Sequence, residues 1–349
     1  MPSKTQDAGT TPEYRTLGES INIATRPVHT SLNKLIILRL RLALPPHADD
    51  ASNYVQGLLH IAPIYTTFET LWQEILDTPL HLPTSASGVL LTASSPDSQV
   101  SPRIHAILAA THFKALERSA ALKTDLTRMT GWNASELEAH LDEVPRESRA
   151  LAAFLVRVRR TAEQRPHALL AYAWVLYMAL FAGGRFIRAS LERVDPGDRF
   201  WGPLYEGDGG GKAEIGLGAE DEEDEDEDDD EGNRSPRMRM ERMPGAFPTS
   251  ASVSMSVNAQ QGRVRKAVEK AEELQHPSSF FRFDTPADGQ DLRQAFKARV
   301  AEATDVLTPG EIEDVVNEAR DIFEQMISLV GELDDVCGTE YEATAAAAA

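Results

Sequence analysis

Residues 169–189 read LLAYAWVLYMALFAGGRFIRA, an apolar helical pattern interrupted by the pair Gly183-Gly184. Each glycine inside a helix costs about 1 kcal/mol relative to alanine, so two in succession indicate a local reason for their presence. Ala179 lies one turn before Gly183, and these small residues leave a strip of backbone bare on one face. Such a strip suits the close approach of a planar ligand or of a neighbouring helix, and tight helix packing is the commoner outcome for this motif alone.

The composition indicates a folded protein that carries one strongly acidic segment. The chain has 349 residues, 42% of them hydrophobic, and a formal net charge of -20. The unbroken acidic run Glu220–Glu231 holds much of that charge, which argues against broad binding to nucleic acid or anionic membranes, since both need clustered Lys and Arg. The lone cysteine Cys337, the polar N-terminus and the lack of a long apolar run predict a soluble cytoplasmic protein without a transmembrane anchor.

Helical periodicity dominates the sequence and predicts an all-α fold. We expect helices over residues 24–44, 54–76 with a kink or junction at Pro63, 104–129, 146–161, 166–192, 263–274, 288–303 and 308–336. The last of these begins with Thr308-Pro309-Gly310-Glu311, a capping-box pattern. Residues 83–102 are rich in serine and proline, which predicts a loop.

The segment around the acidic run predicts disorder. Residues 206–262 combine glycines, the acidic run and a Met- and Arg-rich stretch, a composition that buries too little apolar area to offset chain entropy. We therefore expect one discontinuous helical domain over residues 16–205 and 263–338, with disordered ends at 1–15 and 339–349. The insertion is either a solvated loop, which is the commoner outcome, or an interaction segment whose acidic run Glu220–Glu231 binds a basic partner.

His29 and a pair of cations are the candidate ligand contacts. His29 precedes Leu32 and Ile36 by three and seven residues, so its imidazole is expected on the apolar face of its helix. A buried neutral imidazole can be the axial ligand of haem iron, although a core histidine with a structural role is the commoner outcome. Arg293 and Lys297, one helical turn apart, suit the two carboxylates of a ligand, and a solvated helix face explains them equally well.

Several stretches, taken together and in order, resemble the haem oxygenase family. They are ATRPVHT at residues 24–30, around the proximal histidine; LERSAALKTDL at 116–126, in the middle helix; RPHALLAYAW at 165–174 with the glycines 183–184, in the distal helix; FFRF at 280–283 and QAFKAR at 294–299, before and in the propionate-contacting helix; and Thr308-Pro309, at the start of the final helix. The resemblance implies a multi-helical fold in which haem is sandwiched between a proximal and a distal helix.

The resemblance also implies roles for particular residues. It makes His29 the axial ligand of the haem iron, Gly183 and Gly184 the distal backbone against the macrocycle, Arg293 and Lys297 the propionate contacts, and Tyr65 and Trp174 neighbours of the pocket. The family's reaction opens haem, which is both cofactor and substrate, to biliverdin, carbon monoxide and iron. It uses oxygen and electrons from a reductase, which is therefore the implied partner.

The distal stretch departs from the family pattern where protons are delivered. The family usually reads Gly-Asp-Leu-Ser-Gly-Gly, but residues 179–184 here read ALFAGG, so Leu180 replaces the aspartate that organises the water network. Leu176 replaces a family arginine, and Asn22 replaces a basic residue before the proximal histidine. Loss of a proton-delivery group typically costs ~10²–10⁴-fold in rate, so turnover can fall without loss of haem binding. We expect Leu180→Asp to increase ring opening.

Three functions stay open on this sequence. Oxidative haem cleavage, with water ordered by backbone carbonyls, is favoured by the persistence of the ligand-holding positions. A non-catalytic haem-binding, sequestering or sensing protein is favoured by Leu180. A scaffold that has lost haem and uses the acidic run is the weakest alternative. The family's membrane tail is not expected, because the chain ends in alanines, and Cys337 is not followed by proline, so a passive thiol is expected there.

Overall fold

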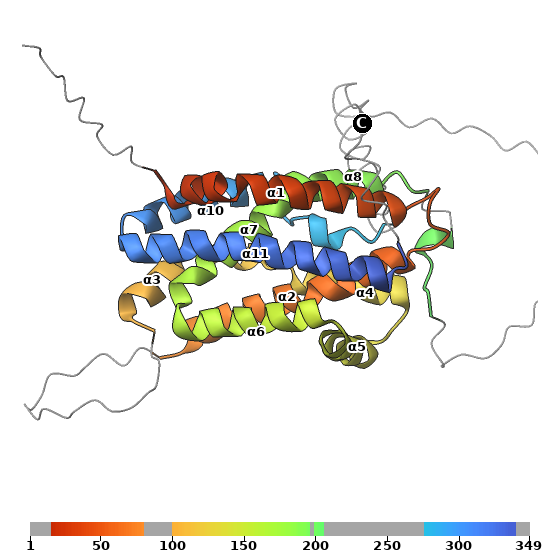
Figure 1. Ribbon diagram of the computed structural model, residues 1–349, viewed down its shortest axis with the longest axis horizontal. Helices are drawn as coiled ribbons and strands as arrows, with labels where there is room; N and C mark the ends of the chain where they lie inside the picture. Colours follow the sequence, from red (N-terminus) through yellow and green to blue (C-terminus); the bar gives the residue numbers. More distant parts are fainter. Residues whose placement is uncertain (1–14, 80–99, 196–198, 206–275, 340–349) are drawn as a thin grey trace, which may run out of the picture. The chain divides into compact units, whose positions relative to one another are not determined.

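The computed structural model describes residues 15–79, 100–195, 199–205 and 276–339, which form helices joined by turns (Figure 1). The α-helices are α1 (Leu17–Leu42), α2 (Ser52–Asp77), α3 (Pro102–Thr111), α4 (Ser119–Thr130), α5 (Ala134–Glu147), α6 (Arg149–Gln164), α7 (Leu169–Ala179), α8 (Arg185–Leu191), α10 (Gln290–Thr304) and α11 (Pro309–Val336). Shorter turns are η1 (Lys114–Leu116), η2 (Pro166–Ala168), η3 (Leu180–Gly184), η4 (Arg199–Trp201) and η5 (Ser279–Phe281). These residues contain no strand, which confirms the all-α class.

The described residues all belong to one compact unit. The predicted disorder of the insertion 206–262 and of the two ends, and the predicted helix over 263–274, lie outside the described residues, as does most of the predicted loop at 83–102. The domain boundaries of the sequence analysis therefore stay predictions over those segments.

Reciprocal caps define where several helices begin. Thr16 accepts a hydrogen bond from the N–H of Glu19, and the Glu19 carboxylate accepts one from the N–H of Thr16. The same pairing begins α5 and α11, at Asn133 with Glu136 and at Thr308 with Glu311. Each cap of this kind stabilises its helix by about 1 kcal/mol. The capping box predicted at Thr308 is thus confirmed.

The core lies where α7 is surrounded by α2, α6 and α11. The side chains of α7 from Leu169 to Tyr177 are all buried, as expected of a helix that is apolar all round. The ring of Tyr172 lies 6.0 Å from that of Phe68 in α2 and 6.3 Å from that of Phe154 in α6. Full burial of one such side chain contributes about 1.5–3 kcal/mol. In Figure 1, α11 runs alongside α1, and it also packs on α7.

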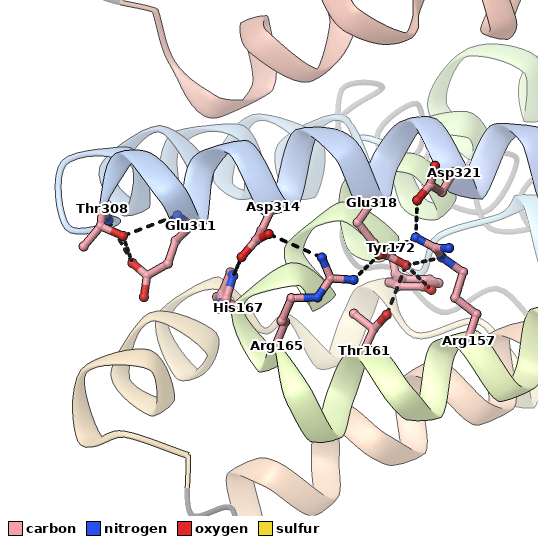
Figure 2. A network of polar contacts seen from close by, with 10 residues as sticks. All are labelled: Arg157, Thr161, Arg165, His167, Tyr172, Thr308, Glu311, Asp314, Glu318 and Asp321. Atoms are coloured by element: carbon pink, nitrogen blue, oxygen red, sulfur yellow. Dashed lines mark hydrogen bonds and ion pairs between the residues drawn. The ribbon is translucent and has the colours of Figure 1, made fainter.

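A buried carboxylate fastens α11 to α6 and α7 (Figure 2). Glu318 is 0% exposed, and its oxygens accept hydrogen bonds from Arg157 at 2.8 Å, Tyr172 at 2.7 Å, and Thr161 and Arg165 at 3.1 Å. Burial alone would raise the pKa of Glu318, but the hydrogen bonds from Arg157 and Tyr172 outweigh it and lower that pKa. The ionised carboxylate therefore holds three helices together from the middle of α11.

The predicted single helix over residues 104–129 is wrong, because the chain is broken between α3 and α4. Glu69 of α2 explains the break: its carboxylate accepts the N–H groups of Arg118 at 2.7 Å and Ser119 at 3.0 Å. These are among the first N–H groups of α4, which have no partner within their own helix. A capping residue so distant in the sequence leaves no local signal.

Helix α5 was not predicted. It follows Gly131, whose φ of 77° ends α4, and among its side chains only Leu137 and Leu141 are buried. Two apolar positions make a weak periodic pattern, so the helix depends on the Asn133 cap. Helix α6 begins at Arg149 rather than at the predicted residue 146, and α2 continues through Pro63.

Residues 166–191 are, among the described residues, the one stretch long and apolar enough to cross a membrane by length and composition. The prediction that no such run exists is therefore wrong for this stretch. In the fold, 61% of its most apolar window is buried, because it forms the core helix α7 and its continuation.

Candidate functional site

His29 lies on α1 with its side chain exposed. Its ring meets the ring of Phe323 in α11 edge-on, with centroids 5.3 Å apart and an interplanar angle of 67°. Its Nε2 lies 3.1 Å from Nδ2 of Asn33, one turn further along α1. The expectation of a buried imidazole is therefore wrong for this structure: Leu32 is buried, whereas His29 is exposed with its ring against Phe323 at the edge of the core. The ring is oriented by two neighbours and remains accessible.

The glycine pair lies in η3, a π-helical turn between α7 and α8. Turns of this kind within α-helices are frequent at functional sites. Ala179, Ala182 and Gly183 are exposed, whereas Leu180 and Phe181 are buried. The exposed side of this turn therefore presents backbone and methyl groups, which is the bare strip that the sequence predicts.

Gly183 and Gly184 differ in what a side chain at each position would contact. A Cβ at Gly184 would lie 3.1 Å from Cδ1 of Phe281, so Gly184 allows the turn to pack on η5. A Cβ at Gly183 would meet no atom within 4 Å. Gly184 is buried, so Gly183 is the one of the pair whose backbone is accessible.

A buried hydroxyl supports this turn from α2. Tyr65 donates to the carbonyl oxygen of Leu176 at 2.9 Å, while the N–H of Leu180 donates to the carbonyl of Tyr177. One turn after Tyr65, the carboxylate of Glu69 accepts from the Tyr177 hydroxyl at 3.3 Å, and burial raises the pKa of Glu69. Tyr65 therefore lies beside the end of α7 with its hydroxyl already engaged, and its place near a ligand pocket stays a prediction.

Trp174 sets the place where α7 meets α1. Its indole Nε1 donates to Oδ1 of Asn22 at 3.1 Å, and its ring covers Gly18, where an added Cβ would overlap the ring. The side chain is buried, so Trp174 joins the two helices and has no free indole N–H. In the sequence, Asn22 stands out only because the family has a basic residue there. In the fold, its side-chain oxygen accepts this hydrogen bond.

Arg293 and Lys297 lie on α10 and differ in their surroundings. Arg293 is half-buried, and its Nε is buried without a hydrogen-bond partner. Lys297 is exposed and lies near Glu19 of α1: hydrogen bonds from Thr16 lower the pKa of Glu19, and the positive charge of Lys297 adds to that effect. Both cations are available to an anionic ligand, and Arg293 needs one more acceptor.

His29 is a lone ring and not part of a metal cluster. Among the described residues, no three His, Cys, Asp or Glu side chains gather as they do around zinc. A single imidazole is how haem iron is often held from the proximal side. The sequence reasoning did not identify Asn33 or Phe323; the four-residue spacing of Asn33 from His29 could have shown the first, but Phe323 is too distant in the sequence to give a signal.

A family model and one curated relative match this chain in sequence. The haem oxygenase family model matches residues 99–332. The haem-binding protein HMX1 of Saccharomyces cerevisiae is 26% identical over 182 residues, which are 51% of this chain and 50% of that protein. The chain thus spans about half the length of this curated relative.

Solved haem oxygenases have a similar fold. Haem oxygenase 2 from Chlamydomonas reinhardtii superposes with a TM-score of 0.55 at 13% identity, over 91% of this chain and 98% of that chain. Haem oxygenase-2 from Synechocystis sp., solved with haem and NO, gives a TM-score of 0.53 at 14% identity, over 92% and 86% of the two chains. At these identities the likeness concerns the fold. Since the family model covers more than half of the sequence and the fold agrees, this chain belongs to the haem oxygenase family.

Proposed function

We propose that this protein binds haem between α1 and η3, with His29 as axial ligand, and cleaves it oxidatively to biliverdin, carbon monoxide and iron with electrons from a reductase. The observation that carries the proposal is the combination of an accessible imidazole on α1 with a bare π-helical turn at Gly183. An axial nitrogen on one side and a surface without bulky side chains on the other suit a flat tetrapyrrole. Membership of the haem oxygenase family supports the same ligand.

The residues present fit haem at its edge as well as at its faces. Arg293 has a buried Nε without a hydrogen-bond partner, and Lys297 is exposed one turn away. A guanidinium group with an unpaired N–H suits a carboxylate, because the two carboxylate oxygens can accept parallel hydrogen bonds from two guanidinium nitrogens. Phe186, three residues after Gly183, is 47% exposed and offers an apolar surface to the ring.

Asn33 is the polar neighbour of the His29 ring. Nδ2 of Asn33 lies 3.1 Å from Nε2 of His29, so this ring nitrogen is held at the exposed surface of α1. When bound, haem supplies the iron that activates oxygen and the ring that is oxidised. If Nε2 of His29 held the iron, its contact with Asn33 would be given up on binding.

Proton delivery on the distal side is the step for which this chain lacks the family side chain. Leu180 is 4% exposed and carries no titratable group. In the proposed enzyme, water ordered by the exposed backbone between Ala179 and Gly183 delivers the protons. Leu180 equally favours the alternative function, haem binding without turnover, and the yeast relative bears the name of a haem-binding protein.

The decisive experiment is a single-turnover measurement on the purified protein with one equivalent of haem, oxygen and an electron donor. We expect a Soret band that decays into biliverdin absorption, and loss of normal axial ligation in His29→Ala. The matched control is His47→Ala, another exposed histidine, which should behave as wild type. A stable Soret band would establish the haem-binding alternative, and an unchanged haem spectrum in His29→Ala would overturn the ligand assignment.

The partners and the compartment belong to this proposal as well. We propose an electron-donating reductase as partner and a cytoplasmic location, and the basic partner of the run Glu220–Glu231 stays a prediction from the sequence. Pull-down with the isolated full chain and with a chain lacking residues 220–231 tests the last point.

A further inference from the structure

Two arginines from different helices meet at one neutral amide beside the distal turn. Nη1 of Arg293 in α10 lies 3.4 Å from Oε1 of Gln290. When the amide of Gln290 is turned over, its oxygen instead accepts from both terminal nitrogens of Arg185, with Nη1 at 3.1 Å. The amide has a single oxygen, so in each orientation that oxygen serves only one of the two guanidinium groups. Arg185 is exposed, whereas the buried Nε of Arg293 lacks an acceptor in either orientation.

The nearby carboxylates form their hydrogen bonds and ion pairs with other groups, although the charge of Arg185 contributes to the lowered pKa of Asp288. Asp288 accepts from Arg188 at 2.6 Å and from the N–H of Phe283 at 3.2 Å. Glu192 is shared by Arg188 at 2.9 Å and Arg282 at 2.6 Å. In the described part of the chain, neither Arg185 nor Arg293 forms an ion pair, and Nε of Arg293 is buried without a hydrogen-bond partner.

We infer that Arg185 and Arg293 together bind one carboxylate of the ligand, so that α8 fixes how the ligand is turned within its own plane. The inference rests on the proposed function. A carboxylate between the two guanidinium groups accepts hydrogen bonds from both. The Gln290 oxygen can then accept from either arginine. Lys297, one turn along α10 and near Glu19, then faces a second carboxylate.

This placement has a chemical consequence for the proposed reaction. Arg185 directly follows Gly184, so a carboxylate held there lies beside the turn that presents the backbone of Gly183. The two propionates of haem lie on one edge of the ring. Holding one of them at Arg185 therefore decides which ring edge faces Gly183, and with it the position at which the ring is opened.

The test measures binding of metal-free protoporphyrin IX, which needs no axial ligand, by its fluorescence. We expect Arg185→Gln and Arg293→Gln each to weaken binding about tenfold or more, as for loss of a charge-assisted hydrogen bond. The control is Arg299→Gln, which removes the same charge from α10 at a residue paired with Glu302 at 2.8 Å. Arg185→Lys should give an intermediate affinity, because it keeps the charge but loses the planar fork.

The dimethyl ester of protoporphyrin IX lacks both carboxylates, so we expect it to bind all these variants with equal affinity. Equal affinity of wild type and Arg185→Gln for protoporphyrin itself would overturn the inference and leave the proposed function standing. Failure of haem and protoporphyrin to bind the wild type would instead overturn the proposed function. If the wild type turns haem over, a changed ratio of biliverdin isomers in Arg185→Gln is the second expected result.

Discussion

At the scale of single residues, small side chains decide how closely the helices of this fold approach. Gly18 lies under the ring of Trp174, where a Cβ would overlap ring atoms, whereas Gly57 in α2 would meet nothing within 4 Å. Both are helical glycines, and the sequence does not distinguish them. Only the contact across helices shows that one is required and the other is replaceable.

These two glycines provide a matched pair for a stability test. Gly18→Ala forces Trp174 away from α1 and should lower the free energy of unfolding by about 1–3 kcal/mol, the usual range for overpacking. Gly57→Ala should raise it by about 0.5–1 kcal/mol, because alanine is the better helix former and has room. Urea unfolding of both variants measures the difference. Equal effects of the same sign would contradict the packing of Trp174 on Gly18.

Leu180 allows the proton route to be tested at one residue. Because it is 4% exposed, Leu180→Asp should destabilise the fold by about 2 kcal/mol or more, through burial of a carboxyl group. We nevertheless expect the variant to convert a larger fraction of bound haem in a single turnover than wild type. Leu180→Asn is the control, since it adds polarity without a titratable group. Equal conversion by both variants would place the proton route elsewhere.

At the scale of elements, local sequence predicts where helices exist better than where they break. The sequence predicts helices at α1, α7 and α11 from their apolar runs, and it predicts the capping box at Thr308. The break before α4 was not, because Glu69 caps that helix from α2. The glycine pair Gly183-Gly184 indicated a local irregularity in the helix, and the structure has a π-helical turn there.

The turn η3 gives a prediction that separates packing from binding. Gly184→Ala should destabilise the protein, because its Cβ would lie 3.1 Å from Phe281 and that ring must shift. Gly183→Ala should leave the melting temperature unchanged or higher but weaken haem binding, since the added methyl group occupies the exposed side of the turn. Thermal melts and haem titrations of both variants test this. Unaltered haem affinity in Gly183→Ala would remove η3 from the ligand surface.

At the scale of the whole molecule, the fold depends on contacts that link distant parts of the chain. Glu318 in α11 joins α6 and α7, and the Phe323 ring on the same helix orients His29 in α1. Sequence motifs were sufficient to identify the family and the position of His29. They could not show that His29 is exposed or that Trp174 is bound to Asn22, because both facts depend on which helix faces meet.

The Glu318 contacts predict how stability depends on pH. The pKa of Glu318 is lower in the fold than its ordinary value of 4.5, so its contribution is present above about pH 4.5 and is lost as the pH falls through the folded pKa. Glu311, whose pKa the hydrogen bond from Arg103 lowers to about 2, acts in the same direction. Glu318→Gln should therefore cost on the order of 2–3 kcal/mol at neutral pH and much less near pH 3.

Urea unfolding at neutral and acid pH measures this cost. Glu324→Gln, at an exposed position of the same helix, is the control and should cost little at either pH. An equal cost of Glu318→Gln at both pH values would mean that its charge does not contribute to holding α11.

Because His29 is exposed, the stability of the fold and the ability to bind a ligand at this residue can change independently. A side chain outside the core contributes little to folding, so replacing it changes what the protein can hold without changing whether it folds. Residue 29 can therefore change in descendants of this chain while the surrounding helices stay the same, and under the proposed function such a change alters the axial ligand.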